Sequence, residues 1–447
     1  MKWFIFVMLM LLTPITCAAD WPMFGHDPQH TGVAGESVEP PLELLWKFKT
    51  NSSSRSSPAI SDDTVYIGSG DSYVYALDAA TGTEKWEYKV GGGIWSSPAV
   101  TGDILYIGVE DQFGTYLYAL NAVTGTEKWK YEIGVAIPPP YPPTVSDGTV
   151  YFGIWWLGSG SGGSVCALDV ATGEKKWEYK TDRAISSSPT VSGDIVYIGS
   201  WDNYIYALDV ITGAEKWKYE TGYMVVSSPA VAGNTVYIGS TDSYLYALDA
   251  VAGTEKWKYK TDDYIVSSPA VSGDTVYIGS KDEYVYALDA DTGAEKWKYK
   301  TGGWIPMDSS PAISGSTAYI GSDDCIYALD TVTGTEKWKY KTSGHVSSPA
   351  VSGGVVYIGS NDGYVYAFAP ATTIPNPTPA PTSTQTTTPT PTQTPTTGSI
   401  SVSSAPSAAD IYLDGAYKGT TPATIPDVPP GSHTLKLEKY GYAEWLT

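Results

Sequence analysis

One short pattern, Glu-Lys-Trp or a close variant of it, recurs along the chain at an almost constant interval. Its tryptophans are Trp86, Trp129, Trp177, Trp217, Trp257, Trp297 and Trp338. The interval is close to 40 residues, and a fixed period of this size indicates one supersecondary unit that is stacked many times. The spacing therefore restricts the chain to a repeat architecture.

A single unit can be read from residues 267–301, SSPAVSGDTVYIGSKDEYVYALDADTGAEKWKYKT. Alternating apolar and aromatic stretches are separated by Gly-Asp, Lys-Asp and Asp-Thr-Gly turns, which predicts four short antiparallel strands. Four such strands form one propeller blade. The 46 glycines and 35 tyrosines of the chain agree with many short strands and tight turns, so the predicted fold class is all-β.

The number of blades follows from counting each kind of strand. A first-strand proline occurs eight times, at Pro58, Pro98, Pro143, Pro189, Pro229, Pro269, Pro311 and Pro349. Only seven Glu-Lys-Trp strands follow these prolines, because the last unit ends after three strands. The orphan segment PLELLWKFKT, residues 41–50, supplies the missing strand. We therefore predict an eight-bladed propeller over residues 41–369, closed by an N-terminal strand that leaves no open edge. The alternative is a seven-bladed ring with a stray strand.

The eleven residues from Ala287 to Trp297 explain how one blade can hold the next. Ala287 leaves room, Asp289 can accept hydrogen bonds from turn amides, and Gly293 admits a positive φ. Trp297 then has space to pack against the neighbouring sheet. We assign a structural docking role to eight tryptophans: Trp46, Trp86, Trp129, Trp177, Trp217, Trp257, Trp297 and Trp338.

This pattern, A-x-D-x-x-T-G-x-x-x-W, resembles the tryptophan-docking motif of the pyrroloquinoline-quinone-like (PQQ-like) propeller repeat. It occurs at Ala76–Trp86, Ala167–Trp177, Ala207–Trp217 and Ala287–Trp297. WPMFGHDPQHTG, residues 21–32, resembles the segment that precedes the propeller in secreted members. The resemblance implies one of two functions. One is a quinoprotein dehydrogenase, and the other is a cofactor-free scaffold similar to the BamB-type lipoprotein of outer-membrane β-barrel assembly.

Several features favour the scaffold over the enzyme. The dehydrogenases that this repeat resembles carry long loop insertions, and many have a vicinal cysteine pair and a Glu, Asn and Asp set around calcium. The sequence has no Cys-Cys pair, and most of its units are minimal 40-residue repeats. We therefore expect no enzymatic activity, no catalytic residues and no cofactor. The alternative is a PQQ-dependent alcohol or sugar dehydrogenase that uses PQQ and calcium, since a fold alone does not fix function.

Histidines and cysteines suggest no reactive centre. His26 and His30 stand four residues apart, but Pro28 between them breaks the helical geometry that a metal pair would need. We interpret both as packing and turn residues and expect no metal site. Cys166 and Cys325 fall at different positions of different units, which predicts buried free thiols rather than a disulfide.

A binding face is suggested by the tryptophans that docking does not use. Trp95 and Trp304 lie in fourth-to-first strand junctions, and the others lie in second-to-third strand loops: Trp155, Trp156 and Trp201. In a four-stranded meander both kinds of connection leave from one face of the ring. The loops at 136–143 and 154–163 belong to the same face.

Aspartates of the second-to-third strand loops add a ring of carboxylates to that face. They are Asp71, Asp111, Asp202, Asp242, Asp282, Asp324 and Asp362. In one interpretation each merely stabilises its own hairpin. In the other, aromatics beside carboxylates bind a sugar polymer or a cationic peptide. We predict that the partner is an envelope protein or glycan, bound by a propeller that is itself monomeric.

The N-terminus and the charge indicate where the protein acts. Residues 1–19 have a basic start, an apolar core and the small-residue stretch CAA, the layout of a signal peptide. The mature chain then begins near Asp20, secreted or at the cell surface and without a membrane span; an alternative is lipidation at Cys17. The net charge of −21 and pI near 4.5 argue against nucleic acid as a partner.

The last part of the chain has two further segments. Residues 370–398 are rich in Pro and Thr and predict an extended linker. Residues 399–447 resemble a PEGA domain, with a hairpin at Asp414–Gly415, a Pro430–Gly431 turn and the pair Gly441–Tyr442. The family usually adds one more strand, so we expect a truncated module. Such domains recur on surface proteins, notably of archaea, which implies envelope association. A third possibility for the whole chain is a structural adhesin whose face binds nothing specific.

Overall fold

The computed structural model describes residues 20–112, 114–134, 141–155, 162–307, 309–371, 398–402, 410–413, 416–420, 423–428, 435–438 and 445–446. The chain divides into two compact units, residues 1–376 and 377–447, and each is described by itself. The expected signal segment, Cys17 and nearly all of the expected linker lie outside the described residues.

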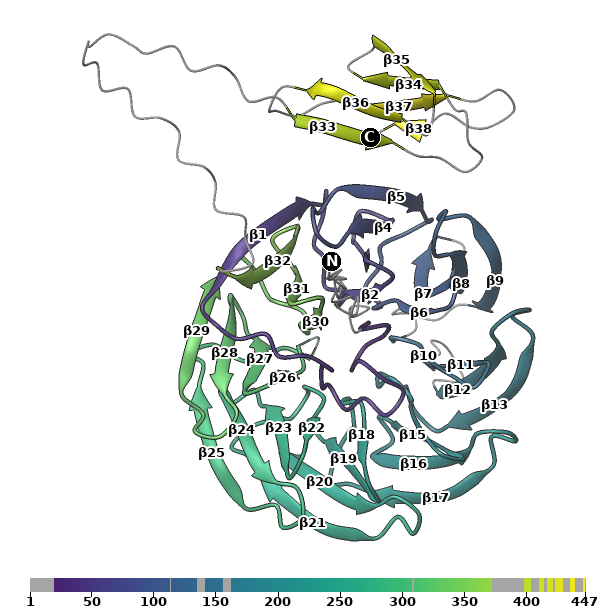
Figure 1. The fold of residues 1–447 in the computed structure, drawn as a ribbon. Coiled ribbons are helices and arrows are strands. Elements are labelled where there is room, and N and C mark those ends of the chain that lie inside the picture. Colours follow the sequence, from purple (N-terminus) through teal and green to yellow (C-terminus); the bar gives the residue numbers. More distant parts are fainter. Residues whose placement is uncertain are drawn as a thin grey trace, which may run out of the picture. The chain divides into compact units, whose positions relative to one another are not determined.

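The first unit is a ring of eight four-stranded antiparallel sheets (Figure 1). The innermost strands are β2 (Ala59–Ser61), β6 (Ala99–Thr101), β10 (Thr144–Ser146), β14 (Thr190–Ser192), β18 (Ala230–Ala232), β22 (Ala270–Ser272), β26 (Ala312–Ser314) and β30 (Ala350–Ser352). The second strands are β3 (Thr64–Gly68), β7 (Ile104–Asp111), β11 (Thr149–Trp155), β15 (Ile195–Gly199), β19 (Thr235–Gly239), β23 (Thr275–Gly279), β27 (Thr317–Gly321) and β31 (Val355–Ser360).

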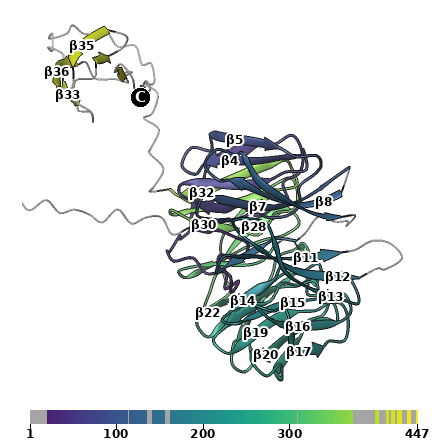
Figure 2. The same ribbon diagram turned by 90° about the vertical axis from the view of Figure 1, so that its right-hand side faces the viewer.

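The outer half of each blade has the same regularity, and Figure 2 shows the ring from the side. The third strands are β4 (Tyr73–Asp78), β8 (Gly114–Asn121), β12 (Gly163–Asp169), β16 (Tyr204–Asp209), β20 (Tyr244–Asp249), β24 (Tyr284–Asp289), β28 (Cys325–Asp330) and β32 (Tyr364–Pro370). The outermost strands are β5 (Glu84–Lys89), β9 (Glu127–Gly134), β13 (Lys175–Thr181), β17 (Glu215–Glu220), β21 (Glu255–Lys260), β25 (Glu295–Lys300), β29 (Glu336–Lys341) and β1 (Leu42–Lys49).

The eighth blade is assembled from both ends of the propeller. Its strand order is β1-β32-β31-β30, and Trp46 of β1 lies opposite Ala367 of β32 in the antiparallel register. In Figure 1 the purple β1 lies beside the green β32. The predicted eight-bladed all-β fold and its closure by the segment at 41–50 are confirmed, and the seven-bladed alternative is wrong.

Tryptophans of the outer strands join each blade to the next. Trp257 of β21 donates its Nε1–H to the carbonyl oxygen of Ala290, 3.0 Å away in the following blade. Its ring packs on Gly293, which has a φ of +71°. The same kind of indole-to-carbonyl bond is made by Trp46, Trp86, Trp129, Trp177, Trp217 and Trp297. Trp338 makes no such bond among the described residues, and it packs against Phe368 with ring centroids 5.3 Å apart.

Residues 20–40 run along the inner strands and fill one end of the central channel. Trp21 exchanges two backbone hydrogen bonds with Ile60 of β2. The carbonyl oxygens of this segment also accept hydrogen bonds from the inner-strand N–H groups of Val100, Val191, Val231, Val271 and Ile313. The extension therefore ties six blades together from the inside, in addition to the closure by β1.

His30 is the buried centre of this extension and is only 2% exposed. Its Nδ1 lies 2.8 Å from Thr190 Oγ1, and its Nε2 lies 3.0 Å from Thr144 Oγ1. Burial lowers the pKa of His30 to about 4, against a smaller opposing effect of Asp27. His26 lies edge-on to Trp21, with ring centroids 4.9 Å apart. Both histidines thus have packing contacts.

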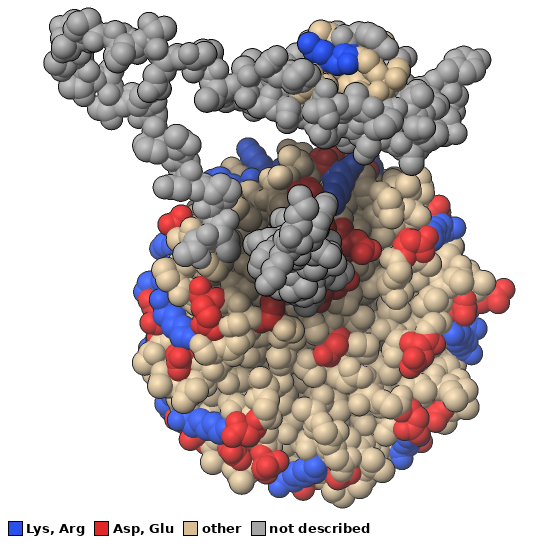
Figure 3. All heavy atoms as spheres, in the orientation of Figure 1, with Lys and Arg blue, Asp and Glu red and all other residues tan. Residues whose placement is uncertain are grey.

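The propeller core is made of separate apolar clusters between neighbouring blades, each containing inward tyrosines, valines and isoleucines. Cys166 and Cys325 are both buried and free, as predicted. On the face seen in Figure 3, acidic and basic side chains gather around the outer edge of the ring. The ion pairs of the propeller include Lys216 with Asp194 at 2.6 Å and with Asp209 at 3.2 Å.

The second unit is a small β module. Its strands are β33 (Gly398–Val402), β34 (Asp410–Leu413), β35 (Ala416–Thr420), β36 (Ala423–Val428), β37 (Leu435–Glu438) and β38 (Trp445–Leu446). Leu413 pairs with Ala416, so the strands of the expected hairpin are joined, although Asp414 and Gly415 themselves lie outside the described residues. Within the described ranges, no helix has the length and hydropathy needed to cross a bilayer.

Candidate binding pocket

A cavity of about 780 Å³ opens at the middle of one face of the propeller. Its walls come from the fourth-to-first strand junctions and the second-to-third strand loops, the connections that the sequence placed on a single face. Trp95, Trp201 and Trp304 line it. These residues are far apart in sequence, and the ring brings them to the rim of one pocket.

The structure describes one of the other two tryptophans that were predicted on this face. Trp155 ends β11 and packs against Trp201, with ring centroids 4.6 Å apart. Trp201 also donates its Nε1–H to Ser186 Oγ at 2.6 Å, so its ring is held in place, and of this pair only Trp201 lines the pocket. Trp156 lies outside the described residues.

Four aromatic side chains present exposed rings at the pocket. Trp95 is 42% exposed, Trp304 37%, Tyr223 50% and Tyr264 47%. All four lie in fourth-to-first strand junctions. Large exposed aromatic rings that converge on a concave site are typical of ligand-binding surfaces.

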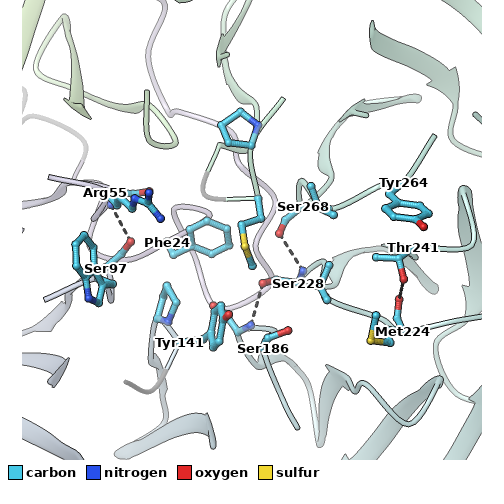
Figure 4. Close-up of a pocket in the computed structure, with 18 of the residues that line it drawn as sticks. Phe24, Arg55, Ser97, Tyr141, Ser186, Met224, Ser228, Thr241, Tyr264 and Ser268 are labelled. Carbon is cyan, nitrogen blue, oxygen red and sulfur yellow. Dashed lines mark hydrogen bonds between the residues drawn. The ribbon is translucent and has the colours of Figure 1, made fainter. Parts of the chain in front are cut away.

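The floor of the pocket is a chain of hydrogen bonds between serines of successive blades (Figure 4). The N–H of Ser188 donates to Ser228 Oγ, and the N–H of Ser228 donates to Ser268 Oγ, both at 2.9 Å. The N–H of Ser57 likewise donates to Ser97 Oγ at 2.8 Å. These serines precede the first-strand prolines, so the repeat itself positions them.

Phe24 of the N-terminal extension closes the floor. It is 8% exposed, and in Figure 4 it lies in the middle of the pocket, between Ser97 and Ser228. Its ring packs edge-on against His30 with centroids 5.4 Å apart. The buried extension therefore turns the channel into a closed bowl rather than a pore.

The charges of the lining have one sign. Arg55 and Lys281 line the pocket together with His345, and the lining contains no aspartate or glutamate among the described residues. The Arg55 guanidinium lies 5.5 Å from the ring centroid of Trp95, and Lys281 Nζ lies 5.5 Å from that of Trp304. The pocket is thus cationic in a chain whose net charge is −21.

The predicted ring of aspartates has internal hydrogen-bond partners. Asp242 accepts from the N–H of Tyr244 at 3.0 Å, from the Tyr246 hydroxyl at 2.6 Å and from the N–H of Gly222 at 2.6 Å. The same three kinds of contact occupy Asp71, Asp202, Asp282 and Asp362.

Two aspartates of that ring differ from the others. Asp324 pairs with Lys341 at 2.9 Å, because its loop is one residue shorter. The side chain of Asp111 lies outside the described part. The contacts of the other five match the hairpin interpretation, and neither these five nor Asp324 lines the pocket.

The described lining of the pocket does not provide the ligands that a calcium-bound quinone would need. Calcium takes six to eight oxygen ligands, largely from carboxylates, and the described lining has none. No group of three His, Cys, Asp or Glu side chains among the described residues could hold a metal ion. Cys166 and Cys325 are buried in different blades, so they cannot form a vicinal pair.

The sequence reasoning missed the cations, the tyrosines and the serine floor. The serines could have been found, because Ser-Ser-Pro opens most of the repeats. Arg55 and Lys281 could not be singled out, since each occurs at one position of one repeat in a strongly acidic chain. Tyr223 and Tyr264 are two of 35 tyrosines, most of which belong to strands.

The fold and its pocket define an eight-bladed propeller of tryptophan-docked repeats with a bowl on one face. Four overlapping segments, residues 38–153, 136–263, 221–324 and 281–376, match the family described as outer membrane protein assembly factor BamB. These segments cover most of the chain, which therefore belongs to that family. Residues 397–447 match the PEGA domain.

Solved structures of both functional classes resemble the propeller. BamB from Moraxella catarrhalis is 23% identical, with a TM-score of 0.62, over 74% of this chain and 98% of that one. A quinohemoprotein alcohol dehydrogenase from Comamonas testosteroni is 16% identical, with a TM-score of 0.65, over 78% and 80%. The designed protein Ika8 is 17% identical, with a TM-score of 0.61, over 75% and 100%.

Identities this low show a shared fold and no more. No curated protein matched the chain by sequence. None of these findings supports the archaeal association expected from the PEGA-like tail.

Proposed function

We propose that this protein is a non-enzymatic interaction scaffold of the cell envelope, whose pocket face binds an envelope protein or glycan. The observation that carries the proposal is the pocket of about 780 Å³ with exposed Trp95 and Trp304 at its rim. Concave sites of this size that combine aromatic walls with a few polar groups are typical ligand sites. Membership of the BamB family and the PEGA tail support the envelope as the location.

Cosedimentation of the full chain with envelopes of the host cell tests the proposal. We expect the chain to pellet with envelopes, and we expect the double variant Trp95→Ala, Trp304→Ala to lose most of this retention. Ile211→Ala is the matched control, because Ile211 is 80% exposed in a turn of the opposite face. Equal retention of all three proteins would place the anchor in the tail and contradict the assigned face.

A quinone-dependent alcohol or sugar dehydrogenase is the competing function, favoured by the fold shared with quinohemoprotein dehydrogenases. The described part of the lining supplies no carboxylate for calcium, which argues against the dehydrogenase. Titration of the full chain with PQQ and calcium, followed by dye reduction with alcohols and sugars, separates the two functions. Dye reduction that depends on both additives would replace the scaffold proposal.

A further inference from the structure

Several polar groups of the pocket are hydrogen-bond donors with few or no partners. Lys281 Nζ makes no hydrogen bond or ion pair with any described residue, and the indole N–H groups of Trp95 and Trp304 have no acceptor there. Arg55 uses only its Nε, which donates to Asn361 at 3.3 Å. These groups face a cavity whose described lining has no carboxylate to accept their hydrogens.

The floor adds buried donors of the same kind. Ser97, Ser228 and Ser268 are each 4–5% exposed, and each Oγ accepts a backbone N–H from the preceding blade. Their own hydroxyl hydrogens have no acceptor among the described residues. A buried donor without a partner costs free energy, so these hydroxyls favour a ligand, or water, that brings oxygen acceptors into the bowl.

The two cations are positioned against aromatic platforms. Arg55 lies beside Trp95, and Lys281 lies beside Trp304. The two tryptophans belong to the junctions that lead into the second and seventh blades. A flat ring beside a fixed cation can stack on the C–H face of a sugar while the cation pairs with a carboxylate on that sugar. The pocket repeats this arrangement on two sides.

Two carboxylates beside lining residues have partners of their own. Asp323 Oδ1 lies 2.5 Å from His345 Nδ1, and the carboxylate of Asp282, next to Lys281, accepts hydrogen bonds from Asp262, Tyr284 and Tyr286. Neither of these acids lines the pocket. Charge complementarity therefore selects an anionic, acceptor-rich occupant for a pocket within an acidic protein.

We propose that the pocket binds an acidic glycan, a segment of polysaccharide whose sugars carry carboxylate groups. The inference rests on the proposed scaffold function and specifies its partner. Exposed aromatic rings stack on the sugars, Arg55 and Lys281 pair with the carboxylates, and the serine floor donates to ring and hydroxyl oxygens. An acidic peptide fits less well, because it offers carboxylates but no sugar face for the exposed rings to stack on.

Isothermal titration calorimetry of the full chain with tetragalacturonate tests this assignment. We expect saturable binding that weakens as salt rises, and binding of neutral cellotetraose that is at least about tenfold weaker, as expected when charged hydrogen bonds are absent. N-acetylated, C-amidated tetraglutamate provides the same four carboxylates without sugar rings, and we expect it to bind more weakly than tetragalacturonate. Equal affinity for tetraglutamate or for cellotetraose would overturn the proposal.

Variants connect the binding to these residues. Arg55→Gln and Lys281→Gln should each weaken tetragalacturonate binding by about tenfold, with unfolding midpoints unchanged because both side chains are at the surface. Lys258→Gln is the matched control, since Lys258 Nζ also lies 5.5 Å from an aromatic centroid, that of Tyr244, but outside the pocket. Unchanged affinity of both pocket variants would also overturn the proposal.

A wrong glycan assignment and a wrong scaffold function would give different experimental results. If tetragalacturonate does not bind while Trp95→Ala, Trp304→Ala still abolishes envelope retention, the face is a binding site for another class of partner and the glycan assignment is wrong. If retention is also independent of the face, both proposals fail.

Discussion

The indole nitrogen of Trp46 donates a hydrogen bond to the carbonyl oxygen of Ala79 at 2.9 Å, although the two residues belong to blades built from opposite ends of the propeller chain. Trp46 lies on β1 in the eighth blade, and Ala79 follows β4 in the first. The ring of Trp46 also packs against Gly82, where a Cβ would lie 2.6 Å from its Cδ2. One docking contact therefore closes the seam between the last blade and the first.

Replacement of Trp46 tests how much this closure contributes. Trp46→Ala removes a buried ring and its hydrogen bond, so we expect a loss of about 3–5 kcal/mol in the free energy of unfolding. Trp338→Ala is the comparison, because Trp338 is less buried and makes no indole-to-carbonyl bond with a described residue. Urea unfolding followed by circular dichroism should show a larger loss for Trp46→Ala. Equal losses would mean that closure adds nothing beyond packing.

Two glycines of the sixth blade separate a crowding effect from a backbone effect. Gly273 and Gly293 have φ values of +59° and +71°. Only Gly293 faces a ring, because a Cβ added there would lie 2.6 Å from the ring of Trp257. Gly273→Ala should cost about 1 kcal/mol from the positive φ alone. Gly293→Ala should cost about 1–3 kcal/mol more, because the docked ring must shift. Thermal unfolding of both variants measures the difference, and similar midpoints would contradict a docking role for Gly293.

Much of the fold was predictable because it is encoded by repetition. The period of the tryptophans sets the blade, and the mismatch between eight first-strand prolines and seven following outer strands assigns Trp46 to the last blade. The path of residues 20–40 through the channel was not predictable. It depends on backbone hydrogen bonds, such as those between Trp21 and Ile60, which leave no periodic side-chain signal.

The candidate site was predictable only in part. Trp95, Trp201 and Trp304 could be placed on one face because docking had accounted for the other repeated tryptophans. The cationic lining could not be predicted, since Arg55 and Lys281 each stand alone among repeats that have other residues there. The sequence favoured hairpin stabilisation as the role of the carboxylate ring but left binding open, and the contacts of residues such as Asp242 agree with the hairpin role.

Substitution of Asp242 tests the structural role of that ring. In Asp242→Asn, an amide NH₂ replaces an oxygen that accepts from both Tyr246 and Gly222, so we expect a loss of about 1–3 kcal/mol in stability. Binding of envelopes or of tetragalacturonate should not change. Asp262→Asn is the control, because the Asp262 carboxylate is exposed and accepts no hydrogen bond from a described residue. Lost binding with unchanged stability would show that the carboxylate contacts the ligand.

His30 gives the propeller a specific sensitivity to acid. Its pKa is lowered to about 4 in the folded chain by burial, whereas the unfolded chain keeps the ordinary value of about 6.5. The unfolded state therefore binds a proton first as the pH falls. The stability that neutral His30 contributes to the folded state is fully present above pH 6.5, and it is lost progressively as the pH falls to about 4. The shift corresponds to about 3 kcal/mol.

The variant His30→Gln isolates this effect from the titration of carboxylates. Glutamine cannot be protonated, so the free energy of unfolding of His30→Gln should change with pH only through the other titratable groups, including Glu39. Burial alone would raise the pKa of Glu39, but hydrogen bonds from Thr317 and Ser316 lower it to about 2. Unfolding free energies of both proteins should be measured from pH 7 to pH 4. We expect any advantage of the unsubstituted chain over His30→Gln to shrink by about 3 kcal/mol over that range. A constant difference would mean that folded His30 keeps the ordinary pKa of the unfolded chain, and an advantage that grows as the pH falls would mean that His30 is charged in the folded state, with both ring nitrogens donating to Thr144 and Thr190.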